Sequence, residues 1–248
     1  MRTVAISCLF LFVASDSKGQ SPEPPISDTR LSVSTLLRED IFAGWRASDM
    51  DRLARAEKNI ELLLRMRPNQ KPDLLAWKGS ATMYRAVLAH EAGKSGQFDS
   101  LHTKALALFA EARKLGPMRS AVAAVVGGTY ALFADRLPKK HRRTAWADSY
   151  TSYKVLWSQQ SQVLEKLPLH TRGELLAGLA QASQRTGRSK ELDIYLDKIL
   201  TLLPDTRYAR VAKSWKEDPE FAARSNISCK YCHKPGRLSA KLAALKGK

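Results

Sequence analysis

The sequence contains little cysteine and few of the residues that favour β-strands. Only three cysteines occur in 248 residues, and two of them stand three positions apart, so disulfide bonds cannot hold a fold of this size together. Alanine, leucine, lysine, arginine and glutamate are abundant instead, and these residues favour helices. The apolar fraction of 44% is ordinary for a chain that buries a sizeable core. We therefore predict an all-α protein.

Long hydrophobic runs are also missing. A transmembrane helix needs about 20 consecutive apolar residues, and the apolar stretch at residues 4–14 is too short. Arg2 precedes this stretch and small residues end it, an order typical of a secretory signal peptide. We interpret residues 1–15, with Cys8, as a cleaved signal and residues 16–35 as a disordered, proline-rich linker. The alternative for the first segment is a simple hydrophobic N-terminal helix.

Negative charge is scarce relative to positive charge. Lysine and arginine number 41 against 24 acidic residues, a formal net charge of +17, and such a field attracts acidic partners. The basic residues are spread along the chain, with one dense cluster at residues 139–143. No helix carries a sustained basic stripe, and aromatic residues do not alternate with cations as in a nucleic-acid groove. An acidic protein is therefore the expected partner, and nucleic acid is not expected.

Helical patterns fill residues 36–215 and come in pairs. A proline ends the second helix of each pair, because proline lacks the N–H that a helix requires. These prolines are Pro68, Pro117, Pro168 and Pro204. Small residues that would let paired helices approach closely are Gly44, Gly79, Ala105 and Ala112. Large residues that would fill the space between the helices are Leu63, Phe109 and Leu196.

These offsets resemble the tetratricopeptide repeat, whose period is about 34 residues. The resemblance covers residues 36–204 in four units, and two of the units are longer than the family pattern. It implies a solenoid in which stacked helix pairs bury a continuous core and present a surface for a partner. An irregular helical bundle is the alternative arrangement. We place the repeat domain at residues 36–215 and a separate C-terminal segment at residues 216–248.

The two remaining cysteines belong to a short motif in that C-terminal segment. Cys229, Cys232 and His233 match C-x-x-C-H, the attachment sequence of haem c. Positions i, i+3 and i+4 share one face of a helical turn, so two thiols can bond to the haem vinyl groups while the adjacent imidazole reaches the iron. With this cysteine and histidine content, chance produces the motif in roughly one of a thousand such chains. We predict one covalent haem c, with His233 as its proximal ligand.

Three other interpretations of the motif stay open. A disulfide between Cys229 and Cys232 suits an oxidising compartment but leaves His233 without a role. A zinc site needs a fourth ligand. That ligand would have to be one of the other histidines: His90, His102, His141 or His170. A thioredoxin-type motif lies beside a parallel sheet, and no sheet is predicted.

The second axial ligand of ordinary cytochromes c is missing from its usual place. In that family a methionine well downstream of the motif usually supplies it, but only fifteen residues follow His233 and none is methionine or histidine. The distal position is therefore open, filled from the repeat domain, or filled by a partner. Candidates in the repeat domain are the four other histidines together with Met66, Met83 and Met118.

The rest of the C-terminal segment suggests how a haem would be covered. Residues 239–248 form a short basic amphipathic tail. Its apolar face, with Leu238, Leu242 and Leu245, would lie over the haem edge or back on the helical domain. Aromatic residues close in sequence, which would shield the ring or pack the last helix, are Trp215, Phe221 and Tyr231.

Taken together, the sequence predicts an exported, periplasmic or secreted mono-haem c protein that docks a partner for electron transfer. Haem c is assembled outside the cytoplasm in bacteria, which agrees with the predicted signal. A scaffold whose haem is structural or a gas sensor, and a secreted adaptor without cofactor, are the alternatives. The sequence contains no phosphate loop, nucleophile elbow or H-E-x-x-H motif, so no catalytic residues are assigned.

Overall fold

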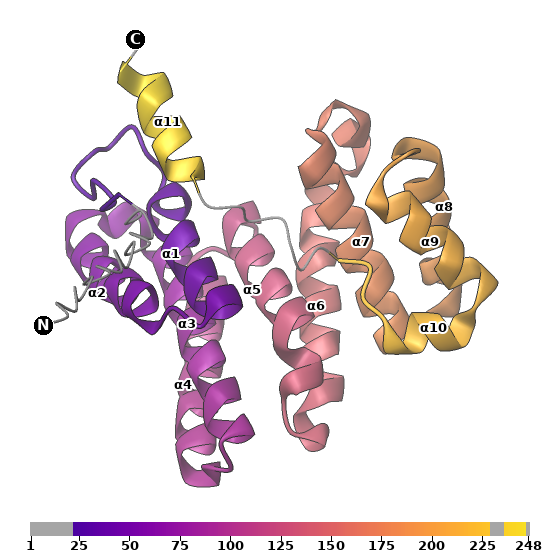
Figure 1. The fold of residues 1–248 in the computed structure, drawn as a ribbon, viewed down its shortest axis with the longest axis horizontal. Helices are drawn as coiled ribbons and strands as arrows, with labels where there is room; N and C mark the ends of the chain where they lie inside the picture. The colour runs from indigo at the N-terminus through magenta and orange to yellow at the C-terminus, as the bar shows by residue number, and fades with distance from the viewer. Residues whose placement is uncertain (1–21, 229–235, 247–248) are drawn as a thin grey trace, which may run out of the picture.

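A computed structural model describes residues 22–228 and 236–246 of the chain. Within these residues the chain forms eleven α-helices, three short 3₁₀-helices and no strand, which confirms the all-α prediction (Figure 1). The α-helices are α1 (Val33–Ala47), α2 (Met50–Met66), α3 (Lys71–Glu91), α4 (Ser95–Leu115), α5 (Ser120–Phe133), α6 (Lys139–Gln160), α7 (Leu169–Arg185), α8 (Ser189–Leu202), α9 (Arg207–Glu217), α10 (Pro219–Arg224) and α11 (Arg237–Lys246). The 3₁₀-helices are η1 (Pro68–Gln70), η2 (Ala134–Arg136) and η3 (Ser161–Lys166).

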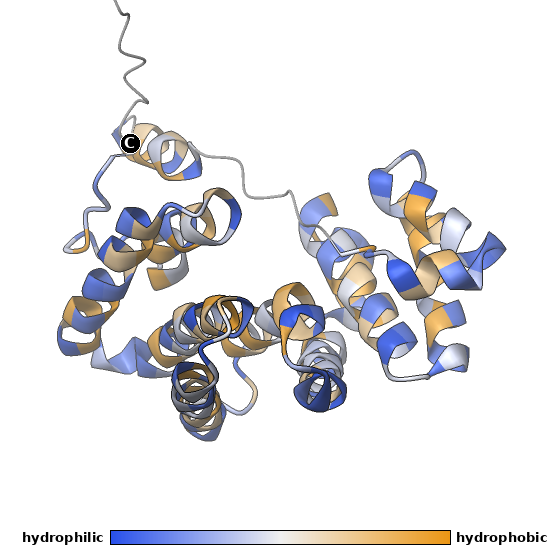
Figure 2. Ribbon diagram, turned by 60° about the horizontal axis from the view of Figure 1, so that its bottom comes forward, coloured by the Kyte–Doolittle hydropathy of each residue, from blue (hydrophilic) through white to orange (hydrophobic). Residues whose placement is uncertain are grey.

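The first eight helices pack as four successive pairs: α1 with α2, α3 with α4, α5 with α6, and α7 with α8. The first helices also contact one another in order, from α1 to α3, α5 and α7, so they form one continuous layer. Figure 2 shows the stacked pairs following an arc. The fold is therefore a solenoid of helix pairs, as the spacing of the sequence pattern predicts.

The predicted close approaches between paired helices are present. A Cβ atom built on Gly44 would lie 2.8 Å from Cβ of Leu53, on the partner helix α2. One built on Gly79 would lie 2.7 Å from the ring of Phe109, on α4. Both distances are shorter than carbon atoms tolerate, so glycine is what lets these helices meet. Each of the four predicted prolines follows the second helix of a pair: Pro68, Pro117 and Pro168 precede the next pair, and Pro204 precedes α9.

The segment before α1 differs from the predicted disordered linker in its second half. Helix α1 begins at Val33, and Leu31 is buried in the core. The buried guanidinium of Arg67, just after α2, donates hydrogen bonds to three backbone carbonyl oxygens of the segment. These belong to Leu31 (2.7 Å), Ile26 (2.8 Å) and Asp28 (2.8 Å). One arginine thus fixes a stretch whose own sequence shows no helical periodicity.

The helical domain continues beyond its predicted end at residue 215. Trp215 lies inside α9 and is buried, and its indole N–H donates to Oγ of Ser225, 2.7 Å away. This bond fastens α10 to α9, because Ser225 is the residue at which α10 ends. No helix in the described ranges is long and apolar enough to cross a membrane.

The last helix returns to the first one. Helix α11 lies beside α1 (Figure 1), and Leu238 is buried there, with Leu242 and Leu245 packed against the core. Glu39 of α1 accepts hydrogen bonds from the backbone N–H groups of Gly236 (3.1 Å) and Leu238 (3.0 Å). The amphipathic tail therefore lies on the helical domain, one of the two positions that its sequence allows.

Candidate functional site

The predicted haem ligands, Cys229, Cys232 and His233, lie outside the described residues. Tyr231 and the predicted signal at residues 1–15 lie outside them as well. The structure does place the residues on either side of the motif, up to Ser228 and from Gly236 onward. The structure therefore shows what the residues on either side of the motif contact.

The first flank is bound to α7. The backbone N–H and the hydroxyl of Ser228 both donate to Oε1 of Gln181, at 3.0 and 2.6 Å. The amide nitrogen of Gln181 donates in turn to the side chain of Asn226. Gln181 and Ile227 are fully buried. Ser228, which directly precedes Cys229 in the sequence, is thus held against α7.

The second flank is bound to α1, through the two hydrogen bonds that Glu39 accepts from Gly236 and Leu238. Arg237 stands between these residues at the start of α11. Its charge lies close enough to lower the pKa values of both Arg38, on α1, and His170, on α7. The C-x-x-C-H motif therefore connects two anchored points at the N-terminal and C-terminal parts of the solenoid.

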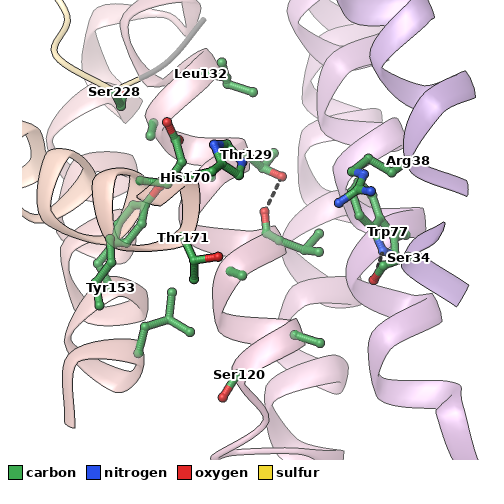
Figure 3. Close-up of a pocket in the computed structure, with 18 of the residues that line it drawn as sticks. Ser34, Arg38, Trp77, Ser120, Thr129, Leu132, Tyr153, His170, Thr171 and Ser228 are labelled. Carbon is green, nitrogen blue, oxygen red and sulfur yellow. Dashed lines mark hydrogen bonds between the residues drawn. The ribbon is translucent and has the colours of Figure 1, made fainter. Parts of the chain in front are cut away.

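A cavity of about 430 Å³ is lined by Ser228, at the first flank, and by Arg38, the neighbour of Glu39 (Figure 3). Residues of α1, α3, α5, α6 and α7 line it, together with Ser228. Its volume falls in the range of roughly 300–1,000 Å³ that is usual for cofactor sites. Aromatic side chains form much of its wall: Phe42, Trp45, Trp77 and Tyr153.

Small residues of α5 leave the space that the cavity occupies. Ala121, Ala124 and Gly128 lie on the face of α5 that lines it. A Cβ atom built on Gly128 would have only the hydroxyl oxygen of Tyr153 within 4.0 Å. The adjacent Gly127 faces α6 instead, where a Cβ atom would lie 3.1 Å from Cβ of Ser152. The two glycines thus serve different purposes, one in helix packing and one in the cavity.

The cavity also has polar lining residues, and the titratable ones are Arg38 on α1, His170 and Glu174 on α7, and Tyr153 on α6. Figure 3 shows the imidazole of His170, on α7, and the guanidinium of Arg38, on α1, extending into the space between the two helices. Burial lowers the pKa of His170, and the charges of Arg237 and Arg38 lower it further. Burial is also the main cause that lowers the pKa of Arg38. These surroundings favour the neutral form of the His170 imidazole over the protonated form.

One aromatic wall residue carries a polar group that the described residues do not satisfy. Nε1 of Trp45 is buried and has no hydrogen-bond partner among them. Its neighbour in the wall, Trp77, donates its indole N–H to Oγ of Ser34 at 3.1 Å. A buried indole N–H without a partner is costly, and an acceptor on a bound molecule would remove this cost.

The other candidate iron ligands lie elsewhere. Met83 is fully buried in the core, and Met66 and Met118 are 49% and 59% exposed on the surface. None of the three lines the cavity. His102 and His141 contact each other where α4 meets α6, with ring centroids 4.5 Å apart. His90 contacts the same ring cluster. Of the histidines and methionines that the sequence offers, only His170 is found among the described residues lining the cavity.

Two other sequence-based expectations concern the aromatic residues before the motif. Trp215 packs α9 and α10 together and does not line the cavity. Phe221 is 42% exposed and does not line it either. Within the described ranges, no group of three or more histidine, cysteine, aspartate or glutamate side chains is arranged to hold a metal ion.

Comparison with protein-family models, curated proteins and solved structures finds no match to this chain. The site must therefore be judged from its own chemistry. A haem is a flat, largely apolar ring with an iron that binds imidazole and two negatively charged propionates. The aromatic wall, the imidazole of His170 and the guanidinium of Arg38 suit these three features, and the unsatisfied indole N–H of Trp45 offers a further donor. Glu174 lines the same cavity, on the same helix as His170. The residues present fit the group.

Proposed function

We propose that this chain is an exported mono-haem c protein that transfers electrons to or from a protein partner. Cys229 and Cys232 would bind the haem through thioether bonds, and His233 would be the proximal iron ligand. The observation that carries this proposal is the C-x-x-C-H sequence. It is supported by Ser228, which directly precedes the motif and lines a cavity of suitable size.

The helical scaffold would have two roles in this function. When bound, haem c supplies a one-electron redox centre. The apolar wall formed by Trp45, Trp77 and Tyr153 would exclude water from it, and a less polar environment favours the reduced state. The tetratricopeptide-like pairs would provide the surface on which the partner docks.

Charge points to an acidic partner. The net charge of +17 would attract a negatively charged protein and accelerate its association at low salt. Association of the haem protein with its partner should therefore slow as ionic strength rises, because salt screens charges over about 10 Å at 0.1 M. A periplasmic location follows from the predicted signal at residues 1–15 and from the place where bacteria assemble haem c.

The deciding experiment tests covalent haem attachment. The chain is exported in a bacterium that carries the haem c maturation machinery, purified, denatured and stained for haem after gel electrophoresis. We expect a stained band that survives denaturation and a reduced visible spectrum typical of a c-type haem. The Cys229→Ala, Cys232→Ala double variant should lose the stain, whereas the Cys8→Ala variant should keep it.

A colourless wild-type protein would overturn the proposal. The cysteines would then be tested for a disulfide by thiol titration and for zinc by metal analysis, the two other chemistries that the motif allows. Either result would leave a secreted helical adaptor. A stained protein whose reduction potential lies outside the range of its redox partners would favour a sensory or structural haem.

A further inference from the structure

We propose that an acidic protein docks at the start of α6, on a surface formed by Lys139, Lys140 and Arg143 of α6 and by Arg188, the residue before α8. We call this surface the basic end. The inference deepens the proposed function and rests on it for the role of the partner. It places the docking surface at the end of the solenoid opposite α11 (Figure 1).

The start of α6 carries four cations in five positions: Lys139, Lys140, Arg142 and Arg143. Arg142 donates a hydrogen bond to the carbonyl oxygen of Leu137 at 2.8 Å. The other three are exposed and form no ion pair with another described residue. No acidic residue stands in the first turn of α6, although a helix N-terminus favours negative charge. The fold thus carries an electrostatic cost here that an anionic partner would remove.

The carboxylates around the basic end are engaged in other contacts. Glu91 of α3 accepts two hydrogen bonds of 2.7 Å from Arg136, and Asp135 accepts one of 3.3 Å from Arg185. Asp99, on α4, is exposed and interacts with the two imidazoles where α4 meets α6. Within the described part of the chain, these contacts leave the basic end with a surplus of positive charge.

The basic end extends along α6 to the turn between α7 and α8. Arg143 and Tyr150 are seven residues apart and therefore share a face of α6. The guanidinium carbon of Arg188 lies 4.2 Å from the centre of the Tyr150 ring, where guanidinium groups stack. Glu191 accepts a hydrogen bond from the Tyr150 hydroxyl and pairs with Lys154 at 3.6 Å, so its charge is shared with α6. The strip from the first residue of α6 to this ring is about 17 Å long.

The basic end is joined to the segment that leads to the C-x-x-C-H motif. Arg185, at the C-terminal end of α7, donates to Asp135 in the turn before α6. The same guanidinium donates to the carbonyl oxygens of Ala222 (3.0 Å) and Ser225 (2.8 Å). A partner docked on the basic end is therefore close to the described residues that precede the motif, which favours this surface over the other cations of the chain.

The surroundings of the basic end favour a protein over a lipid surface. Helices that bind anionic membranes combine cations with large apolar side chains that enter the bilayer. None of the large apolar side chains that are exposed in the described structure belongs to residues 134–143 or 185–190. Charge without an apolar anchor fits the acidic surface of a protein.

The test uses a fluorescent hexaglutamate peptide as a model of an acidic protein surface, because six extended residues span about 20 Å, close to the length of the basic strip. Fluorescence anisotropy at low salt measures its affinity for the purified chain. The Lys139→Gln, Lys140→Gln, Arg143→Gln variant should bind the peptide roughly tenfold more weakly or worse, because it loses three local charges.

A matched control removes the same amount of charge elsewhere. Lys58 of α2 and Lys104 and Lys114 of α4 are also exposed, and their joint substitution by glutamine should change the affinity by less than about twofold. Far-UV circular dichroism shows whether both variants keep their helices. Acetylation of the wild-type lysines, read by mass spectrometry, locates the contact: bound peptide should protect Lys139 and Lys140 and leave Lys104 unprotected.

The outcomes separate this inference from the proposed function. An equal loss of affinity in the two variants would overturn the docking surface, because the overall charge would then explain binding. Wild-type protein that sediments with phosphatidylglycerol vesicles but does not bind hexaglutamate would overturn the choice of a protein partner. Either result with a haem-stained chain leaves the haem c proposal standing. A colourless chain whose peptide binding depends on Lys139, Lys140 and Arg143 would keep the docking surface and overturn the haem c proposal.

Discussion

Glycine shows at the scale of single residues how the same side chain can serve opposite purposes in neighbouring helices. Gly178 lies in the interior of α7, against the ring of Tyr153 on α6, where a Cβ atom would approach a ring carbon to 2.2 Å. Gly128 lies in the interior of α5 beside the cavity, where a Cβ atom has open space. Gly178 is required because its helix contacts the Tyr153 ring too closely for a larger side chain, whereas Gly128 leaves part of the cavity unfilled.

This difference predicts opposite effects of the same substitution. Gly178→Ala should lower the free energy of unfolding by about 1–3 kcal/mol, because the added methyl group overpacks the contact with Tyr153. Gly128→Ala should leave stability unchanged or raise it by up to about 1 kcal/mol, since alanine favours a helix more than glycine does. Urea denaturation followed by circular dichroism measures both. Equal destabilisation of the two variants would contradict the assigned packing.

At the scale of elements, a cluster of rings joins α4 to α6. The rings of Phe98 and His102 stack, with centroids 5.1 Å apart, and His141 of α6 contacts both. Burial is the main cause that lowers the pKa of His102, and interactions with His141 and Lys140 lower it further, while Asp99 opposes them. Burial likewise lowers the pKa of His141. The two helices therefore meet through imidazoles that resist protonation.

The contact between His102 and His141 should make the free energy of unfolding depend on pH. Above pH 6.5, the pKa of histidine in the unfolded chain, His102 is neutral in both the folded and the unfolded protein, so it does not reduce the free energy of unfolding. As pH falls below 6.5, the unfolded chain binds a proton that the folded protein resists, so stability falls by at most about 1.4 kcal/mol per pH unit for this histidine. Thermal unfolding between pH 7 and pH 5 measures the effect. His102→Phe, which retains the ring, should reduce this dependence, and an unchanged pH profile would contradict it.

The same scale shows what could be predicted from the sequence. The helix pairs could be predicted, because prolines stop helices locally and small residues recur at fixed offsets. The end of the helical domain could not be predicted, because only the packing shows that Trp215 fastens α10 to α9. The cavity could not be predicted either. It depends on which face of α5 turns inward, and the adjacent Gly127 and Gly128 point to different surroundings.

At the scale of the whole molecule, the last described helix, α11, packs against the first, α1. The C-x-x-C-H motif lies within the last twenty residues of the sequence, which by itself suggests an appendage. The structure instead returns α11 to α1, so the motif connects the last full helix pair to the first. The sequence offers several histidines, and only the arrangement of the helices shows that His170 is the one among the described residues that lines the cavity.

The carboxylate of Glu39 helps to hold α11 against α1. Glu39 accepts hydrogen bonds from the backbone N–H groups of Gly236 and Leu238 at the start of α11, so it acts as the N-terminal cap of that helix from a distant part of the chain. Glu39→Ala should lower the free energy of unfolding by about 0.5–2 kcal/mol and increase hydrogen exchange of the α11 amides. Glu111→Ala, which removes an exposed ion pair with Lys71 on α3, should leave that exchange unchanged. Hydrogen-exchange mass spectrometry separates the two variants, and equal protection of α11 in both would show that apolar packing of Leu238 alone holds the helix in place.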